Sequence, residues 1–116
     1  MEENKSFVYI LRCADDTLYT GYTTNLKRRV AEHQKGSKKC KYTMATSRRP
    51  VTVASSWSIK GPRGYALRVE AFIKKLIKSK KLSLIKDPGQ LSEWYHMKSG
   101  NYIECDIYSN VEGENK

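Results

Sequence analysis

The first residues that could do chemistry share one face of a predicted helix, which begins at Leu26 and ends near Gly36. The stripe that faces the rest of the molecule contains four residues spaced i, i+3, i+4 and i+7, namely Leu26, Arg29, Val30 and His33. Arg29 can hold an anion with a two-pronged hydrogen bond, or its stem can lie over apolar neighbours while its charge reaches water. His33 can carry a proton, or it can be a partly buried histidine with one hydrogen-bond partner. For each residue alone, the structural alternative is favoured.

A single carboxylate lies at the border of a second apolar stripe. Glu70 and Glu32 are the only acids between Thr17 and Lys86, and the helical spacing of apolar residues over 65–77 places Glu70 beside the packed face. Carboxylates are rarely buried without a partner. Glu70 therefore either forms a salt bridge with a lysine or binds a hard cation such as Mg²⁺, which takes few protein carboxylates together with phosphate and water.

Two tyrosines occur in predicted strands near the start of the chain. Tyr9 lies in 6–12 and Tyr19 in 18–22, and the polar segment between these strands predicts a hairpin. Tyrosines in strands are usually half-buried packing residues with a satisfied hydroxyl. Gly21 shares a face with Tyr19, and a glycine within a strand often marks the close approach of another group.

These residues form motifs that resemble those of the GIY-YIG nuclease family. Phe7-Val8-Tyr9, about ten residues before Tyr19-Thr20-Gly21, resembles the paired GIY and YIG motifs. The continuation through Arg29 to Glu32-His33 resembles the arginine helix of the family, and Ala66-Leu67-Arg68-Val69-Glu70 resembles the helix that carries its metal-binding glutamate.

A second group of residues is similar to the short, stand-alone bacterial members of that family. It consists of Lys41-Tyr42-Thr43 and of Arg48-Arg49-Pro50-Val51. The resemblance covers roughly residues 6–86. It implies an α/β fold in which a small three-stranded antiparallel sheet is flanked by helices, in the order β-β-α-β-α.

The resemblance also implies a site and a reaction. Tyr9, Tyr19, Arg29 and Glu70 would line one basic cleft that hydrolyses phosphodiesters with one divalent cation, Mg²⁺ or Mn²⁺. Arg29 would stabilise charge on the attacked phosphate, and the metal on Glu70 would stabilise the leaving oxygen. Tyr9 is the first choice for the base, Tyr19 would relay or orient, and His33 is a candidate proton carrier; the sequence leaves these roles open.

Two departures from the family pattern are visible. The first motif reads Phe7-Val8-Tyr9, in which only the tyrosine carries chemistry. Many members have an asparagine a dozen or more residues after the glutamate, whereas 80–86 contains none and Ser83 is the nearest small polar residue. One contact to phosphate or metal is therefore in question.

The chain divides by charge into two parts. It has 116 residues and a net charge of +10. Residues 1–86 contain 20 basic and 6 acidic side chains, and residues 87–116 contain 2 and 6. The turn-forming Asp87-Pro88-Gly89 separates them. We therefore expect a GIY-YIG-like nuclease domain over 1–86 and an acidic C-terminal extension over 87–116, which either covers the cleft or packs on the domain as an extra strand within 102–108.

Composition also limits the partners. An excess of basic residues favours a polyanion, and no apolar run approaches the length of about 20 residues that a membrane span requires. Three widely spaced cysteines and a start without signal-peptide character indicate free thiols and a cytoplasmic protein. The residues expected to bind nucleic acid are Lys27, Arg28, Lys38, Lys39, Lys41, Tyr42, Arg48 and Lys74.

The leading interpretation is an endonuclease that acts on DNA and recognises its structure rather than its sequence, alone or with a partner protein that supplies specificity. The alternative is a DNA- or RNA-binding module whose active site is weak or lost, which the missing asparagine and the basic segment 74–86 support. A plain interaction domain with a solvated basic face is a third interpretation. Binding alone would not require Tyr9, Tyr19, Arg29, His33 and Glu70 together.

Overall fold

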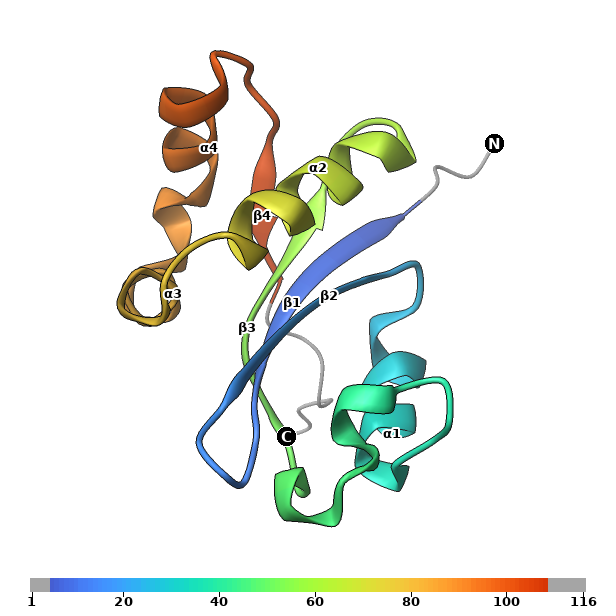
Figure 1. Cartoon of the computed structure of the whole chain (residues 1–116). Helices are drawn as coiled ribbons and strands as arrows, with labels where there is room; N and C mark the ends of the chain where they lie inside the picture. Colours follow the sequence, from blue (N-terminus) through green and yellow to red (C-terminus); the bar gives the residue numbers. More distant parts are fainter. Residues whose placement is uncertain (1–4, 109–116) are drawn as a thin grey trace.

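An antiparallel sheet organises the molecule (Figure 1). The structure is a computed structural model and describes residues 5–108. The strand order is β2-β1-β3-β4, and every neighbouring pair is antiparallel. The strands are β1 (Ser6–Arg12), β2 (Leu18–Thr23), β3 (Thr52–Ile59) and β4 (Cys105–Ile107). The sheet thus has four strands rather than three, because a short strand within the anticipated segment 102–108 pairs with β3.

The helix α1 (Leu26–Lys35) has the two ends that the sequence predicts. The Asn25 side chain accepts a hydrogen bond from the backbone N–H of Arg28 at 3.0 Å, which caps the first turn. Gly36 ends the helix with φ 72°, the left-handed conformation that glycine adopts without strain. These local signals fix where the arginine–histidine stripe begins and ends.

The basic segment after α1 is held by hydrogen bonds to carbonyl groups as well as by packing of Tyr42 against the smaller cluster. It contains two short 3₁₀ turns, η1 (Lys41–Met44) and η2 (Thr46–Arg48). The Arg49 guanidinium donates to the carbonyls of Lys35 and Met44, each at 3.1 Å. This segment is consequently held against the end of α1.

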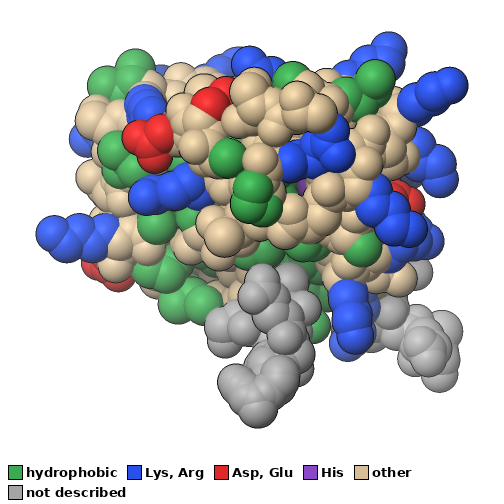
Figure 2. Space-filling view, turned by 90° about the horizontal axis from the view of Figure 1, so that it is seen from below, with side chains coloured by type: hydrophobic (Ala, Val, Ile, Leu, Met, Phe, Trp, Pro, Cys, Tyr) green, Lys and Arg blue, Asp and Glu red, His purple; other side chains and the backbone are tan. Residues whose placement is uncertain are grey.

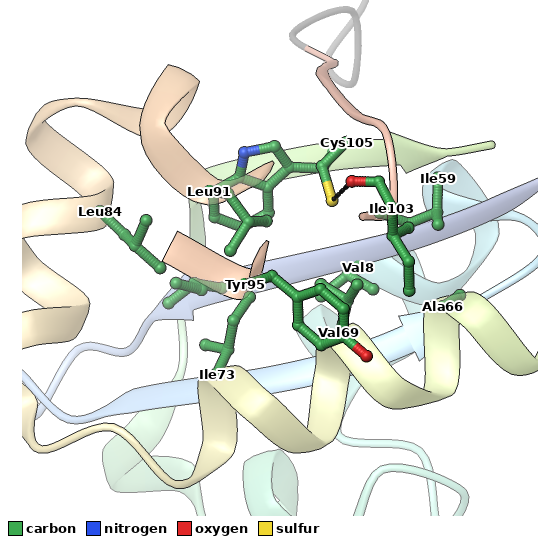
Figure 3. Packing of buried hydrophobic residues seen from close by; sticks show 12 residues of the cluster. Val8, Ile59, Ala66, Val69, Ile73, Leu84, Leu91, Tyr95, Ile103 and Cys105 are labelled. Atoms are coloured by element: carbon green, nitrogen blue, oxygen red, sulfur yellow. Dashed lines mark hydrogen bonds between the residues drawn. The ribbon is translucent and has the colours of Figure 1, made fainter. Parts of the chain in front are cut away.

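Helices α2 (Arg63–Lys74), α3 (Lys78–Lys86) and α4 (Leu91–Ser99) form the larger core with the sheet. Between α3 and α4 lies the 3₁₀ turn η3 (Pro88–Gln90). Helix α2 ends at Lys74, three residues before Ile77, where the helical spacing predicted its end. Ile77 is 67% exposed. Figure 3 shows how α2 and α4 close over the sheet. The buried side chains there include Val8, Trp57, Val69, Ile73, Leu84, Leu91 and Tyr95.

The opposite face of the sheet carries a smaller cluster against α1. Alternation along β1 sends Val8 and Ile10 to the larger core and Phe7, Tyr9 and Leu11 to this smaller one. Leu26, Val51 and Cys13 complete the smaller cluster. The alternation therefore decides which strand residues face the arginine–histidine stripe of α1.

Residues 87–108 belong structurally to the larger core. Leu91, Tyr95 and Ile103 are buried, and the Trp57 indole N–H donates to the Pro88 carbonyl at 2.9 Å. Within 87–108 the strand β4 pairs with β3, and the helix α4 was not anticipated. The domain boundary at residue 86 stays a prediction, and residues 109–116 of the extension lie outside the described part.

Two further features concern the length of the helices and the state of the cysteines. Within residues 5–108 no helix is long and apolar enough to cross a membrane. Cys13, Cys40 and Cys105 are free and buried. Burial raises the pKa of each thiol, that of Cys105 to about 11. These thiols lack the depressed pKa that a reactive cysteine needs.

Candidate active site

A chain of buried hydrogen bonds links the first strand to the segment after α1. The Tyr9 hydroxyl lies 3.0 Å from His33 Nε2, and His33 Nδ1 lies 2.9 Å from Thr43 Oγ1. Thr43 Oγ1 in turn donates to the Cys40 carbonyl at 3.2 Å. Tyr9, His33 and Thr43 are each at most 1% exposed.

The direction of this chain follows from the proton count. The Thr43 hydroxyl has one proton, which it donates to the Cys40 carbonyl, so it accepts from His33 Nδ1–H. His33 Nε2 then carries no proton and accepts from the Tyr9 hydroxyl. This assignment of the tautomer makes Tyr9 a donor and His33 its proton acceptor.

Burial holds both members of the Tyr9–His33 pair neutral. It raises the pKa of the Tyr9 hydroxyl well above 10, an effect that Tyr19 increases and Arg29 partly offsets. Burial also lowers the pKa of His33 to about 4, and the charge of Arg29 adds to that lowering. Proton transfer from Tyr9 to His33 therefore requires additional positive charge at the tyrosine oxygen.

A glycine makes room for the Tyr9 ring. Tyr9 and Gly21 are directly opposite in the β1–β2 pairing. A Cβ atom added at Gly21 would lie 2.5 Å from Tyr9 Cζ and closer still to its hydroxyl oxygen. The close approach that the sequence suggested at Gly21 is thus made by a tyrosine ring.

Tyr19 joins the same aromatic group from β2. Its ring centroid lies 6.4 Å from that of Tyr9 and 5.2 Å from that of His33. Tyr42 stacks on its other side at 5.2 Å, and the Arg48 guanidinium lies 3.9 Å from the Tyr42 ring. Three elements distant in sequence therefore position the Tyr19 ring.

Arg29 extends from the same side of α1 as His33. Its Nε lies 3.0 Å from Glu32 Oε1, but the two atoms are not aligned as a hydrogen bond. Its side chain is 29% exposed, and its charge lowers the pKa of both Tyr9 and His33. The guanidinium therefore lies between solvent and the buried Tyr9–His33 pair.

Glu70 reaches this group through a lysine. Lys74 Nζ lies 3.2 Å from Glu70 Oε2 and 6.0 Å from the centroid of the Tyr19 ring. The Glu70 side chain is 17% exposed. This placement is compatible with both interpretations of Glu70. The carboxylate forms a salt bridge with Lys74, and the ammonium group that it binds is a cation beside the aromatic group.

The donor set fits a metal that takes few protein ligands. Residues 5–108 contain no group of three His, Cys, Asp or Glu side chains able to hold an ion. Mg²⁺ needs only one or two carboxylates when phosphate and water complete its shell. Glu70, whose oxygen lies beside the ammonium group of Lys74, would supply one such carboxylate.

The expected nucleic-acid-binding residues fall into two groups. Lys27, Lys38 and Lys41 are exposed and form no ion pair within residues 5–108. Others are tied to protein partners: Arg28 and Lys39 approach Glu32 at 3.8 and 3.9 Å, and Arg48 binds Asp15 and the Tyr42 carbonyl. Arg48 and Tyr42 therefore also support the fold around Tyr19.

Sequence reasoning missed Thr43 and Arg63. Thr43 had been noted only within the Lys41-Tyr42-Thr43 motif, although its hydroxyl fixes the His33 tautomer. Arg63 and Arg29 line the same pocket. They are 34 positions apart in the sequence, and no helical or strand period predicts that they meet. Only the packing of α2 against β1 and β2 brings the Arg63 side chain to the site.

Comparison with known proteins identifies the class. Residues 5–83 match the protein family described as "GIY-YIG catalytic domain". The chain therefore belongs to the GIY-YIG family, as its motifs indicated.

Within this family the chain is similar to small proteins called UPF0213. The UPF0213 protein of Syntrophus aciditrophicus is 46% identical over 83 residues, which cover 72% of this chain and 92% of the relative. One from Pediococcus acidilactici is 45% identical over 75% of this chain and 87% of its own length. A solution NMR structure of the UPF0213 protein from Bacillus halodurans is 36% identical, with a TM-score of 0.45, over 71% of this chain and 83% of that one.

Proposed function

We propose that this protein is a metal-dependent endonuclease that hydrolyses DNA phosphodiester bonds and recognises DNA structure rather than sequence. The observation that carries the proposal is the buried Tyr9–His33 pair, whose proton acceptor is oriented by Thr43. Burial alone accounts for the hydrogen bond between Tyr9 and His33, but not for the cationic Arg29 beside this neutral pair. A hydrolase can use such a pair to remove a proton from water.

The proposed roles follow from the contacts. Tyr9 accepts a proton from the attacking water as its own proton passes to His33, and the Thr43 contact keeps His33 Nε2 free to receive it. Arg29 binds the attacked phosphate and stabilises its developing negative charge. Tyr19 orients the water or the phosphate from the neighbouring strand.

Glu70 would hold the divalent cation, Mg²⁺ or Mn²⁺, in place of the ammonium group of Lys74. A bound cation would supply Lewis-acid stabilisation of the leaving oxygen and positive charge near Tyr9. The displaced Lys74 can then pair with a phosphate. The high pKa of Tyr9 is the reason that the pair would stay inactive until substrate and cation are present.

The charge of the protein, +10, supports a polyanionic substrate. Figure 2 shows Lys and Arg side chains around the rim of one face, with few acidic side chains among them. Phosphate contacts carry no sequence information, and residues 5–108 form one sheet with its helices and no separate base-reading module. Recognition would therefore depend on DNA shape or on a partner protein.

The test is a cleavage assay on linear, nicked, flap and branched DNA with Mg²⁺ or Mn²⁺. Glu70→Gln and Arg29→Ala should each lower the single-turnover rate roughly 10²–10³-fold, the scale of one lost preorganised charge contact. Glu93→Gln and Arg68→Gln are matched controls, because both side chains are exposed outside the site. Equal cleavage by the wild type and a folded Glu70→Gln variant would disprove the assigned metal role.

A nucleic-acid-binding module is the second candidate. The specific observation in its favour is that burial opposes ionisation of Tyr9 and of His33 alike, and 80–86 offers no asparagine to assist. Tight binding without cleavage of any substrate with either metal would establish this alternative.

A further inference from the structure

A pocket of about 410 Å³ opens beside Arg29. It lies where the end of β2, the start of α1 and the start of α2 meet. Three of its lining residues are arginines, and the full lining is Tyr22, Thr23, Thr24, Arg28, Arg29 and Arg63. A pocket with three guanidinium groups favours an anion.

The positive charge of this pocket is only partly compensated. The ion pairs that its arginines form within residues 5–108 involve one acid, Glu32, which lies near Nε of Arg28 and of Arg29. Arg63 is exposed and forms no ion pair within that range. Its guanidinium carbon lies 5.7 Å from the centroid of the Tyr22 ring, which keeps the charge beside the pocket.

A second observation is an unsatisfied hydroxyl. The Tyr22 oxygen is buried and has no hydrogen-bond partner within residues 5–108. A buried hydroxyl without a partner is costly. Tyr22 lines the pocket, and its ring packs against the larger core. A phosphate oxygen held by the guanidinium groups would accept from this hydroxyl once the side chains that cover the hydroxyl move aside.

We propose that this pocket binds a second phosphodiester of the substrate strand, adjacent to the one that is cut, with Arg63 and Tyr22 as positioning residues. The inference rests on the proposed function, since Arg29 borders both the pocket and the candidate active site. A strand held at two successive phosphates has its scissile bond fixed in direction as well as in place. The pocket opens to solvent, as a strand that continues past the site would require.

The test measures binding without cleavage. A short fluorescent single-stranded oligonucleotide is titrated at several salt concentrations in chelator, with wild type, Arg63→Gln, Tyr22→Phe and the control Arg68→Gln. Arg68 lies on the same helix and is exposed but outside the pocket. Arg63→Gln should weaken binding roughly tenfold relative to this control and reduce the salt slope by about 0.7, the value of one single-strand phosphate contact.

Tyr22→Phe separates a hydrogen bond from a charge. It should weaken binding several-fold while leaving the salt slope unchanged, because it removes no charge. Circular dichroism and thermal unfolding check that each variant folds. If Arg63→Gln matches Arg68→Gln in affinity and in slope, or if the wild type does not bind the oligonucleotide, the second-phosphate site is wrong.

A cleavage arm distinguishes this inference from the proposed function. With Mg²⁺, Arg63→Gln should raise KM and also lower kcat relative to Arg68→Gln, because a strand held at one phosphate fewer presents its scissile bond in the reactive direction less often. If the wild type cuts DNA and Arg63→Gln and Arg68→Gln have the same KM, the nuclease function stands and the second-phosphate site is wrong. If the wild type cuts nothing, yet Arg63→Gln reduces the salt slope of binding, the proposed nuclease function is wrong and the pocket is supported as a phosphate-binding site.

Discussion

Single residues decide whether the buried Tyr9–His33 pair can form, and Gly21 is the first of them. A methyl group there would overlap the Tyr9 ring. Gly21→Ala should therefore lower the free energy of unfolding by about 1–3 kcal/mol, the usual cost of overpacking, and should reduce cleavage by displacing Tyr9.

Thermal unfolding and single-turnover cleavage measure the two effects. Gly64→Ala is the control, since an added Cβ atom meets nothing within 4 Å and alanine favours the first turn of α2. Equal stability of the two variants would show that the Tyr9 ring does not require the glycine.

His33 should make stability depend on pH. Its pKa in the folded protein is about 4, below the value of about 6.5 expected in the unfolded chain. Between these values the unfolded chain binds a proton that the folded protein does not. The stabilisation is therefore complete above pH 6.5 and is lost as the pH falls towards 4, by up to about 3 kcal/mol.

Urea titrations at pH 7, 6, 5 and 4 test this dependence. His33→Gln should flatten the decline between pH 6.5 and 4, whereas His96→Gln, which changes an exposed histidine, should keep it. A wild-type stability that is constant across this window would contradict a buried, neutral His33.

At the scale of elements, α4 completes the core that holds Glu70 in place. Leu91 on α4 and Val69 on α2 are both fully buried in the same cluster. Leu91→Ala should cost about 2–5 kcal/mol of unfolding free energy. Met97→Ala, on the same helix but 74% exposed, should change it by less than about 0.5 kcal/mol.

A chain ended after Lys86 tests the domain boundary that charge and turn residues suggested. It would lack Leu91 and Tyr95 and would leave the Trp57 indole N–H without the Pro88 carbonyl. We expect it to lose cooperative unfolding. A sharp thermal transition at the wild-type temperature would instead show that residues 1–86 fold independently.

At the scale of the whole molecule, the net charge of +10 should govern association with nucleic acid. Affinity for duplex DNA should fall with salt, with a log–log slope of about −0.9 for each phosphate contact. Replacing all three of Lys27, Lys38 and Lys41 by glutamine should make that slope less steep, by the equivalent of up to about three phosphate contacts.

A charge-matched variant with Lys5, Lys60 and Lys98 replaced by glutamine provides the control, because these exposed lysines lie outside the expected binding surface. Fluorescence anisotropy over a range of salt concentrations measures both slopes. Identical slopes for the two triple variants would mean that net charge, rather than the surface near α1, determines binding.

The sequence by itself determined the features that depend on neighbours along the chain. The caps at Asn25 and Gly36 and the stripe that carries Arg29 and His33 follow from contacts within a few residues. Alternation along β1 likewise placed Tyr9 on one face. Four motifs in order were enough to predict the family and three of the four strands, β1, β2 and β3.

Only the tertiary structure decided which distant groups meet. The bond between Tyr9 and His33, the contact of Thr43 with His33 and the approach of Arg63 to Tyr22 join residues whose separation no period encodes. The burial that shifts the pKa of Tyr9 and of His33 is likewise a property of the assembled core. Local spacing fixes the direction of a side chain on its own element, whereas its partner and its dielectric surroundings depend on how the elements pack.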